Sequence, residues 1–252
     1  MTSNQPGQCC SVGVRHEGEP TGKFIKTGNN INAYIATPPA DKAHRHAGIV
    51  YVPDIFGIWV NSQLMADQFA ANGYTCVIPD FFNGDQVASP PPEGFNIMAW
   101  IAGGSTGDNP HTDAHIDPVV LAGVAALRDL GITKIGAVGY CLGAKYVVRN
   151  FKDNIIDVGF LAHPSLVTEE EFSAITGPLS IAAAQTDSIF PLEKRIESEK
   201  ILGKSGLPWQ INLFSGVEHG FAVRGDLKSP VQRFAKEQAF FQAVAWFDEH
   251  LK

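Results

Sequence analysis

Short apolar runs rich in β-branched residues recur along the chain, and stretches with helical spacing separate them. The runs do not alternate apolar with polar residues, which indicates strands that are buried on both faces. The sequence therefore predicts an α/β fold in which helices cover both faces of a mostly parallel central sheet. The expected strands are Ala33–Thr37, Gly48–Pro53, Tyr74–Pro79, Lys134–Gly139, Val158–Ala162, Leu179–Ala184 and Gln210–Phe214.

Helices are expected between these strands, and a glycine marks the end of several of them, as is typical of helix C-caps. Gly73, Gly131 and Gly203 supply these stop signals. Because ligands of such sheets bind beyond the carboxyl ends of the strands, functional residues are expected in the loops there. The predicted helices are Ser62–Asn72, Pro118–Leu130, Gly143–Asn150, Thr168–Ala174, Leu192–Leu202 and Pro230–Leu251.

The chain of 252 residues is 44% hydrophobic, which is enough to bury one sizeable core. No repeat, linker or low-complexity run divides it, so we expect an N-terminal extension at 1–20 and a single α/β domain at 21–252. Residues 81–117 interrupt the alternation with Gly, Pro, Asn and Asp. A connection of that length in a compact domain is usually a functional lid.

Nineteen Lys and Arg against 26 Asp and Glu give a net charge of −7, and no basic residues form a stripe. Nucleic acid is therefore not an expected partner. No apolar stretch approaches the ~18–20 residues of a membrane helix, and the polar first residues lack a signal-peptide pattern. We expect a cytoplasmic protein whose four cysteines stay reduced. No phosphate-cradling loop precedes a helix, so no cofactor is expected.

The segment Gly139–Gly143, with the sequence GYCLG, follows an apolar run and opens a predicted helix. This pattern is typical of a nucleophile elbow, a sharp turn between strand and helix, here with cysteine as the nucleophile. Glycines two positions before and after Cys141 let strand and helix approach closely. The helix N-terminus favours a thiolate there, and the Leu142 N–H can face a developing oxyanion. The alternative is a small buried cysteine that packs at the turn.

A cysteine nucleophile needs a base, and the base needs an orienting carboxylate; in this kind of fold the acid comes next in the chain and the histidine last. Asp187 and His219 each follow a predicted strand in this order. His163 also follows a strand but precedes the acid, and we interpret it as a pocket-wall or hydrogen-bonded structural residue. The alternatives are an N-cap of the helix at Leu192 for Asp187 and an ordinary loop position for His219.

Other cysteines and histidines give weaker patterns. Cys9 and Cys10 are adjacent, which is not a zinc-ligand spacing, and we expect them to pack at the N-terminus or to be unstructured. Cys76 lies in an apolar strand and is assigned to the core. His111 and His115 have the i,i+4 spacing of a metal pair, but the Pro and Asp around them favour a lid. No metal site is expected.

These motifs together resemble the dienelactone hydrolase (carboxymethylenebutenolidase) family of α/β-hydrolases. The resemblance rests on Gly139–Gly143 with its cysteine, the segment around Asp187, His219-Gly220-Phe221, and Pro53-Asp54-Ile55-Phe56-Gly57. It extends from about Gly22 to the C-terminus. The opening CCSVGVRHEGEPTGK and the following GNNINAYIATP resemble the fungal branch. An α/β-hydrolase fold and a hydrolase activity are what this resemblance implies.

The resemblance also implies roles for individual residues. Cys141, His219 and Asp187 take the places of the catalytic triad, and backbone N–H groups of Leu142 and Ile55 take those of the oxyanion hole. The motif PDIFG at Pro53–Gly57 supplies an acidic side chain as well.

In the family that acidic side chain interacts with the resting thiol and helps to activate it. It is Glu in the bacterial enzymes, and Asp54 stands in its place here. Tyr140, His163 and Phe221 are the further residues that we expect near the thiol or in the wall of the pocket.

Bacterial members hold a substrate carboxylate with two arginines. The first place reads Pro79-Asp80-Phe81-Phe82-Asn83-Gly84 here, and no Arg or Lys occurs from His46 to Leu127. Arg224 lies close to the second place, so a bidentate clamp is at best half present. We therefore expect a substrate that is less anionic than a dienelactone carboxylate, or one that is held differently.

The leading hypothesis is a cofactor-independent hydrolase that cleaves a lactone, ester or thioester through an acyl intermediate on Cys141. Its partner is a small-molecule substrate, and the protein is expected to be a monomer or a homodimer. Acyl transfer on the same triad is one alternative. A non-catalytic binding protein or a thiol redox sensor on a hydrolase scaffold is another, although a sensor would want a resolving cysteine and none is near Cys141 in sequence.

Overall fold

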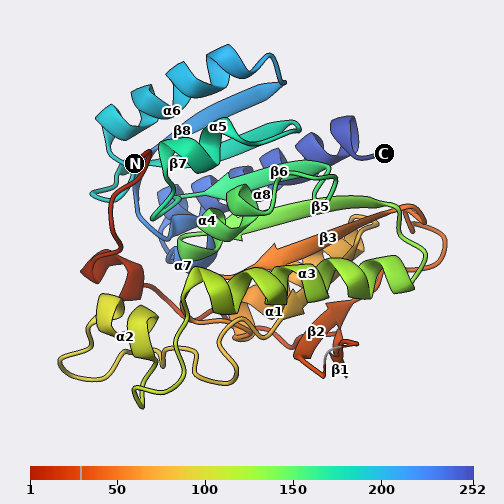
Figure 1. Cartoon of the computed structure of the whole chain (residues 1–252), viewed down its shortest axis with the longest axis horizontal. Coiled ribbons are helices and arrows are strands. Elements are labelled where there is room, and N and C mark those ends of the chain that lie inside the picture. Colours follow the sequence, from red (N-terminus) through yellow and green to blue (C-terminus); the bar gives the residue numbers. More distant parts are fainter. Residues whose placement is uncertain (29) are drawn as a thin grey trace.

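A twisted sheet runs through the whole molecule (Figure 1). The structure is a computed structural model, which describes residues 1–28 and 30–252. The described strands are β1 (Lys23–Lys26), β2 (Asn32–Ala36), β3 (Ala47–Val52), β4 (Thr75–Pro79), β5 (Lys134–Tyr140), β6 (Val158–Ala162), β7 (Leu179–Thr186) and β8 (Trp209–Glu218). They lie in the order β1-β2-β4-β3-β5-β6-β7-β8.

Neighbouring strands from β4 to β8 run parallel, whereas β1 and β2 are antiparallel to their neighbours. This confirms the predicted α/β fold with a mostly parallel sheet. Val52, the last residue of β3, pairs in register with Gly139 of β5. The loop after β3 and the turn after β5 therefore emerge side by side, at the sheet edge where ligands of such folds bind.

The helices of the described chain are α1 (Val60–Ala71), α2 (Ile97–Gly103), α3 (Asp113–Asp129), α4 (Leu142–Arg149), α5 (Glu169–Ser173), α6 (Leu192–Ser205), α7 (Phe221–Arg224) and α8 (Pro230–His250). Helices α3 and α4 pack on one face of the sheet, and α1 and α8 pack on the other (Figure 1). Successive strand residues point to opposite faces. Val50 and Val52 accordingly belong to the core under α3 and α4, and Ile49 and Tyr51 to the core under α1 and α8.

Helix α3 begins five residues earlier than predicted. The predicted helix begins at Pro118, whereas the observed helix begins at Asp113. A proline inside a helix lacks an N–H for the backbone hydrogen bond, which made a start at this residue the simpler expectation. Tertiary contacts hold the extra turn in place, because Ile116 is buried and Arg149 binds both Asp113 and Asp117.

Helix α6 ends later than predicted, because Gly203 lies inside it. The helix continues to Ser205, and Gly206 provides the stop in the left-handed conformation, with φ 71°. Four further short elements were not predicted, namely β1, α2, α7 and a 3-10 helix, η1 (Gln8–Ser11). All four are shorter than the 11–18 residues over which hydrophobic periodicity is recognisable.

The N-terminal segment, residues 1–20, folds back over the carboxyl edge of the sheet. Thr2 and Ser3 are buried, and both bond to the backbone of Val167. From there the segment runs to η1, which lies close to α2 (Figure 1). The segment is therefore packed against the domain from its second residue.

The segment 81–117, predicted as a lid, carries α2 and is tied together by polar contacts. Nε2 of His111 lies 2.9 Å from a carboxylate oxygen of Asp85, and Nε1 of Trp100 donates to the carbonyl oxygen of Asp85 at 3.0 Å. His111 and Trp100 are both buried. Across the described part of the chain, no helix combines the length and apolar character needed to cross a membrane.

Candidate active site

Cys141 lies at the turn between β5 and α4 in a strained backbone conformation. Its φ is 54° and its ψ is −116°, values that a residue with a side chain seldom adopts. A Cβ atom at Gly139 would lie 2.6 Å from Cα of Ala144, and one at Gly143 would lie 2.1 Å from the carbonyl oxygen of Val52. Only glycine therefore fits on either side of the turn, which is the physical reason for the GYCLG pattern.

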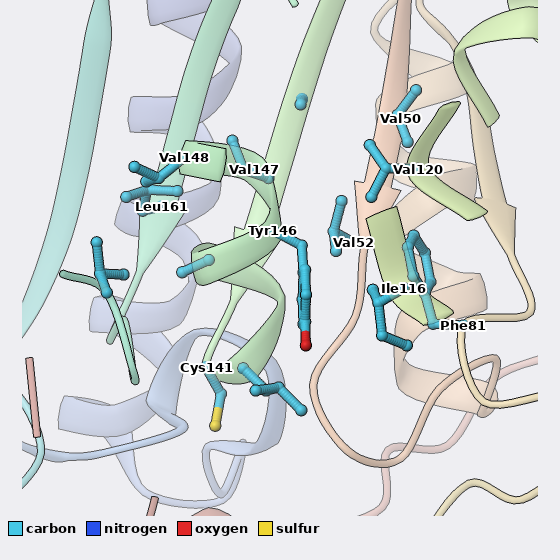
Figure 2. Packing of buried hydrophobic residues seen from close by; sticks show 14 of the residues in the cluster. Val50, Val52, Phe81, Ile116, Val120, Cys141, Tyr146, Val147, Val148 and Leu161 are labelled. Carbon is cyan, nitrogen blue, oxygen red and sulfur yellow. The ribbon is translucent and has the colours of Figure 1, made fainter. Parts of the chain in front are cut away.

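The sulfur of Cys141 points away from the hydrophobic residues around α4. Figure 2 shows it beyond the end of the cluster, on the side away from Val147 and Val148. The side chain is nevertheless completely buried. Polar and sulfur-containing side chains from other parts of the chain, rather than solvent, surround the thiol.

His219 and Asp187 form a buried pair. Nδ1 of His219, which follows β8, lies 3.1 and 3.0 Å from the two carboxylate oxygens of Asp187, which follows β7. Oδ1 of Asp187 also accepts the N–H groups of Ile189 and Phe190. Asp187 does not cap α6, whose N-cap residue is Pro191. The carboxylate binds Nδ1 of the imidazole, so Nε2 faces the cysteine side chains.

The side chain of Cys10 lies between those of Cys141 and His219. This contact was not predicted from the sequence. Its sulfur lies 3.4 Å from that of Cys141 and 3.5 Å from Nε2 of His219. Cys10 is completely buried, whereas Cys9 is half-buried at the surface of η1. The donor atoms of Cys10, Cys141 and His219 all lie within 4.8 Å of one another, which is close enough to share a metal ion.

The charges of this cluster support one another. Burial raises the pKa of the Cys141 thiol, but the hydrogen bond with Cys10 and the charge of His219 outweigh burial and lower the pKa to well below its usual range. Burial opposes protonation of His219, yet the charge of Cys141 and the hydrogen bond to Asp187 raise its pKa to about 10. The hydrogen bond to Cys141 raises the pKa of Cys10, which stays a thiol. The combination favours a thiolate at Cys141 beside an imidazolium at His219.

A buried ion pair joins Asp54 to Arg224 beside this cluster. Oδ2 of Asp54 accepts from the Arg224 guanidinium, and Oδ1 accepts from the N–H of Phe56 at 3.1 Å. Burial raises the pKa of Asp54, although the charge of Arg224 opposes that shift. The family resemblance implies contact between Asp54 and the resting thiol. Within the described chain, the hydrogen bonds of its carboxylate go to Phe56 and Arg224.

Arg224 also anchors the N-terminal segment. Its Nε donates to the carbonyl oxygen of Val12 at 2.9 Å, a terminal nitrogen donates to that of Cys9 at 3.5 Å, and its own carbonyl accepts from Val14. The side chain is 1% exposed. The guanidinium is therefore engaged inside the protein, and a substrate carboxylate could reach it only after the segment moves.

The two backbone groups expected to form an oxyanion hole lie in the adjacent turns. Leu142 is the first residue of α4, where helix geometry leaves the N–H without an intrahelical partner. Ile55 follows the buried Asp54, and its carbonyl accepts the N–H of Val87. Both side chains are buried. The register of β3 with β5 brings these turns together, so their N–H groups remain the predicted oxyanion donors.

The rings of Tyr140, Phe221 and His219 surround the ring of His163. The ring of His163 lies 4.9 Å from that of His219, 5.8 Å from Phe221 and 6.2 Å from Tyr140. Among the described residues, neither ring nitrogen of His163 has a hydrogen-bond partner, and burial keeps its pKa well below the usual range. His163 is therefore a neutral imidazole packed against His219, without a hydrogen bond to its ring from the described residues.

His111 and His115 do not converge on a common point. Nε2 of His111 lies against Asp85, while Nδ1 of His115 lies 2.8 Å from the hydroxyl of Thr112. Helix α3 begins at Asp113, so His111 lies outside it and the helical i,i+4 spacing does not apply. These contacts tie residues of the segment 81–117 to one another.

A cleft of about 920 Å³ separates the N-terminal segment from the segment 81–117. Gln8, Ser11 and Val12 line one side, and residues 89–98 line the other. Cys10 belongs to the same 3-10 helix but is buried toward Cys141. Helix η1 is thus the partition between this cleft and the reactive sulfur.

Comparison with known proteins assigns the chain to a family. The model for the dienelactone hydrolase family matches residues 31–251. The chain belongs to the dienelactone hydrolase family. Membership in this family supports hydrolase activity on a lactone or ester, and hence a small-molecule substrate.

Relatives of the dienelactone hydrolase family match almost the full length of the chain. Hydrolase pyvD of Aspergillus violaceofuscus is 50% identical and covers 100% of both chains. Hydrolase tropI of Talaromyces stipitatus is 45% identical, over 100% of this chain and 99% of its own. The human carboxymethylenebutenolidase homolog is 25% identical, over 99% and 100%. The similarity to pyvD and tropI includes the N-terminal segment.

Solved structures of this family's type show the same fold. A dienelactone hydrolase-like promiscuous phosphotriesterase, P91, from metagenomic libraries has a TM-score of 0.70 at 16% identity and covers 92% of this chain and 99% of its own. An esterase from Thermogutta terrifontis, solved with propionate bound, has a TM-score of 0.66 at 14% identity and covers 91% and 94%. At such identities the likeness establishes the α/β-hydrolase fold.

Proposed function

We propose that the protein is a cofactor-independent cysteine hydrolase that cleaves a lactone, ester or thioester through an acyl intermediate on Cys141. The observation that carries the proposal is the position of Cys141 at a strained elbow, next to the buried His219–Asp187 pair. A non-catalytic binding protein has no need for a cysteine at a positive φ whose pKa is lowered and which lies beside an imidazole held by a carboxylate.

Attack begins from the thiolate, which needs no separate deprotonation when the substrate arrives. Its pKa lies well below the usual range, so Cys141 is a nucleophile at neutral pH. The carbonyl oxygen of the substrate becomes an oxyanion, for which the N–H groups of Leu142 and Ile55 are the proposed donors. The helix N-terminus at Leu142 adds a partial positive charge on the same side.

His219 then serves both halves of the reaction. As an imidazolium it gives its Nε2 proton to the leaving oxygen or sulfur, which releases the first product and leaves Cys141 acylated. As a neutral base it takes a proton from the water that hydrolyses the acyl group. Asp187 holds Nδ1 throughout and stabilises the charged form.

Access is the step that distinguishes this proposal from a permanently open site. Cys141 is completely buried, and η1 lies between it and the cleft lined by Gln8, Ser11 and Val12. We infer that η1 shifts when a substrate enters, because the sulfur of Cys10 lies 3.4 Å from that of Cys141 and leaves no room there for a substrate. All four cysteines are free thiols, which is consistent with a protein that acts in the reducing cytoplasm.

The decisive experiment is the mass of the intact protein after brief exposure to a panel of activated esters, thioesters and lactones. The proposal expects an added mass equal to the acyl group, mapped to the peptide that contains Cys141, and no such adduct in Cys141→Ala. Turnover with no adduct at Cys141, or turnover that survives Cys141→Ala, would contradict the proposed nucleophile. The substrates that acylate fastest identify the substrate class.

A further inference from the structure

Three possible metal-ligand atoms, the sulfur atoms of Cys10 and Cys141 and Nε2 of His219, lie together at the buried side of η1. The sulfur of Cys10 lies 3.4 Å from that of Cys141 and 3.5 Å from Nε2 of His219, and all three side chains are buried. The proposed reaction uses Cys141 and His219 but gives no task to Cys10. We propose that these three residues bind a zinc ion, and that the bound ion reversibly blocks the hydrolase.

The spacing of the donors is that of a zinc site. Zinc binds cysteine sulfur at about 2.3 Å and histidine nitrogen at about 2.0–2.1 Å in tetrahedral geometry. Those lengths place two sulfur ligands about 3.8 Å apart and a sulfur and a nitrogen ligand about 3.6 Å apart. The two separations from the Cys10 sulfur, 3.4 and 3.5 Å, differ from these by a few tenths of an ångström. The third pair, the sulfur of Cys141 and Nε2 of His219, lies within 4.8 Å, so these two side chains would draw closer together around the ion.

Asp187 supplies the support that a histidine ligand of zinc normally has. A metal-bound imidazole usually donates its other N–H to a carboxylate, which fixes the ring and its tautomer. Nδ1 of His219 lies 3.0 Å from Asp187, so Nε2 can present its lone pair to a metal. The carboxylate that orients the base for hydrolysis thus also orients it for coordination.

Charge also favours the exchange. Two cysteines and one histidine release two protons as they bind Zn²⁺, so two thiolates and the ion form a neutral group. The nearest fixed cation, Arg224, is already paired with Asp54 and does not leave an uncompensated positive charge. Soft thiolate ligands with an imidazole select zinc over calcium or magnesium, which prefer oxygen. A water molecule that enters with the ion would complete the tetrahedral shell.

The bound ion would stop catalysis by occupying both reactive atoms. Zinc on Cys141 removes the electron pair that attacks the substrate, and zinc on Nε2 removes the site of proton transfer. Cys10 is the third ligand and sets how tightly the ion is held. This inhibitory part rests on the proposed function, whereas the binding of zinc does not.

The test is a zinc titration of the full chain, kept reduced with a phosphine, in competition with a chromophoric chelator. We expect one tightly bound zinc per chain. Cys10→Ala should weaken binding at least 100-fold, because losing even an outer partner of a ligand costs 10–100-fold. Cys9→Ala and Cys76→Ala are matched controls that remove a neighbouring and a distant thiol, and they should bind zinc as the wild type does. Cys10→Ser serves if Cys10→Ala does not fold.

X-ray absorption at the zinc edge gives a second, independent readout. Two sulfur ligands at about 2.3 Å with nitrogen or oxygen completing the shell are expected, and one sulfur should be lost in the Cys10 variant. A shell without sulfur, or equal affinity in Cys10→Ala and wild type, would overturn the site. A protein that binds zinc but cleaves no ester even after a chelator has removed the ion would leave the site standing and would reject the proposed function instead.

Discussion

The sulfur atoms of Cys10 and Cys141 lie 3.4 Å apart, although 131 positions separate the two residues in the chain. One belongs to a 3-10 helix near the N-terminus and the other to the elbow after the fifth strand. Their approach makes the first dozen residues part of the candidate active site. The hydrogen bond between the two sulfur atoms also helps to lower the pKa of Cys141.

Replacement of Cys141 by alanine should abolish ester or lactone cleavage. The loss is chemical, so the free energy of unfolding should stay within ~1–2 kcal/mol of wild type despite the burial of the side chain. Steady-state assays and urea unfolding measure the two quantities. Cys76→Ala, which removes a buried thiol far from the site, should keep its activity and so controls for the general effect of losing a core sulfur.

His219 and Asp187 should act as one unit. Replacing His219 by Asn or Asp187 by Asn should each lower kcat/KM strongly, and the double variant should be scarcely worse than the poorer single one. The reason is the hydrogen bond at 3.0 Å through which Asp187 acts. Kinetics of the three variants decide the point. Losses that multiply independently, or an equal loss from His163→Asn, would assign the base elsewhere.

The pH profile should show a broad plateau. The pKa of Cys141 is well below its usual range. The acidic limb of the profile, where the thiolate becomes protonated, therefore lies far below pH 9. The pKa of His219 is raised to about 10, so activity falls as pH rises through that value and the leaving group loses its proton donor. Titration of thiolate absorbance in wild type minus Cys141→Ala tests the first limb. In His219→Asn the thiolate should appear only at higher pH.

Neutral substrates should be cleaved better than matched carboxylates. Arg224 is buried and paired with Asp54, and no Lys or Arg occurs from His46 to Leu127, so an anionic substrate meets little compensating charge. Comparison of kcat/KM for a neutral lactone and its carboxylate analogue is the measurement. A preference of tenfold or more for the carboxylate, about 1.4 kcal/mol in transition-state binding, would contradict this expectation.

Breaking the ion pair between Asp54 and Arg224 should be costly. Arg224→Met leaves a buried carboxylate without its partner, and a loss of about 3–5 kcal/mol in the free energy of unfolding is expected. The double variant Arg224→Met with Asp54→Leu should recover much of that loss, because neither charge remains. Urea denaturation of both variants measures it. A single variant as stable as wild type would show that the pair has little structural weight.

The layers of the sheet and the elbow were predictable because local patterns specify them. Apolar runs of β-branched residues locate strands such as Val158–Ala162, and two glycines at fixed offsets locate the turn at Cys141. The order of Asp187 and His219 behind successive strands places them at the same sheet edge. The fold supplies the rest, since parallel strands end together.

Contacts of long sequence separation were not predictable in the same way. Nothing in the spacing of Cys10 indicates that η1 docks on Cys141, and nothing near Arg224 indicates that it pairs with Asp54 rather than facing a substrate. A weak signal existed in the residue type, because an unpaired cysteine is among the most often buried residues and Cys10 stands in a polar segment. Only the docked segment reveals which pocket it fills.

The half-buried position of Cys9 decides how covalent probes will report on this protein. Cys9 is half-buried on the outer side of η1, whereas Cys141 is completely buried behind Cys10. An iodoacetamide or maleimide probe therefore meets Cys9 before it can pass Cys10 to Cys141. Labelling stoichiometry alone would misassign the reactive thiol, and an inhibitor selective for Cys141 needs a shape that opens η1 rather than a stronger electrophile.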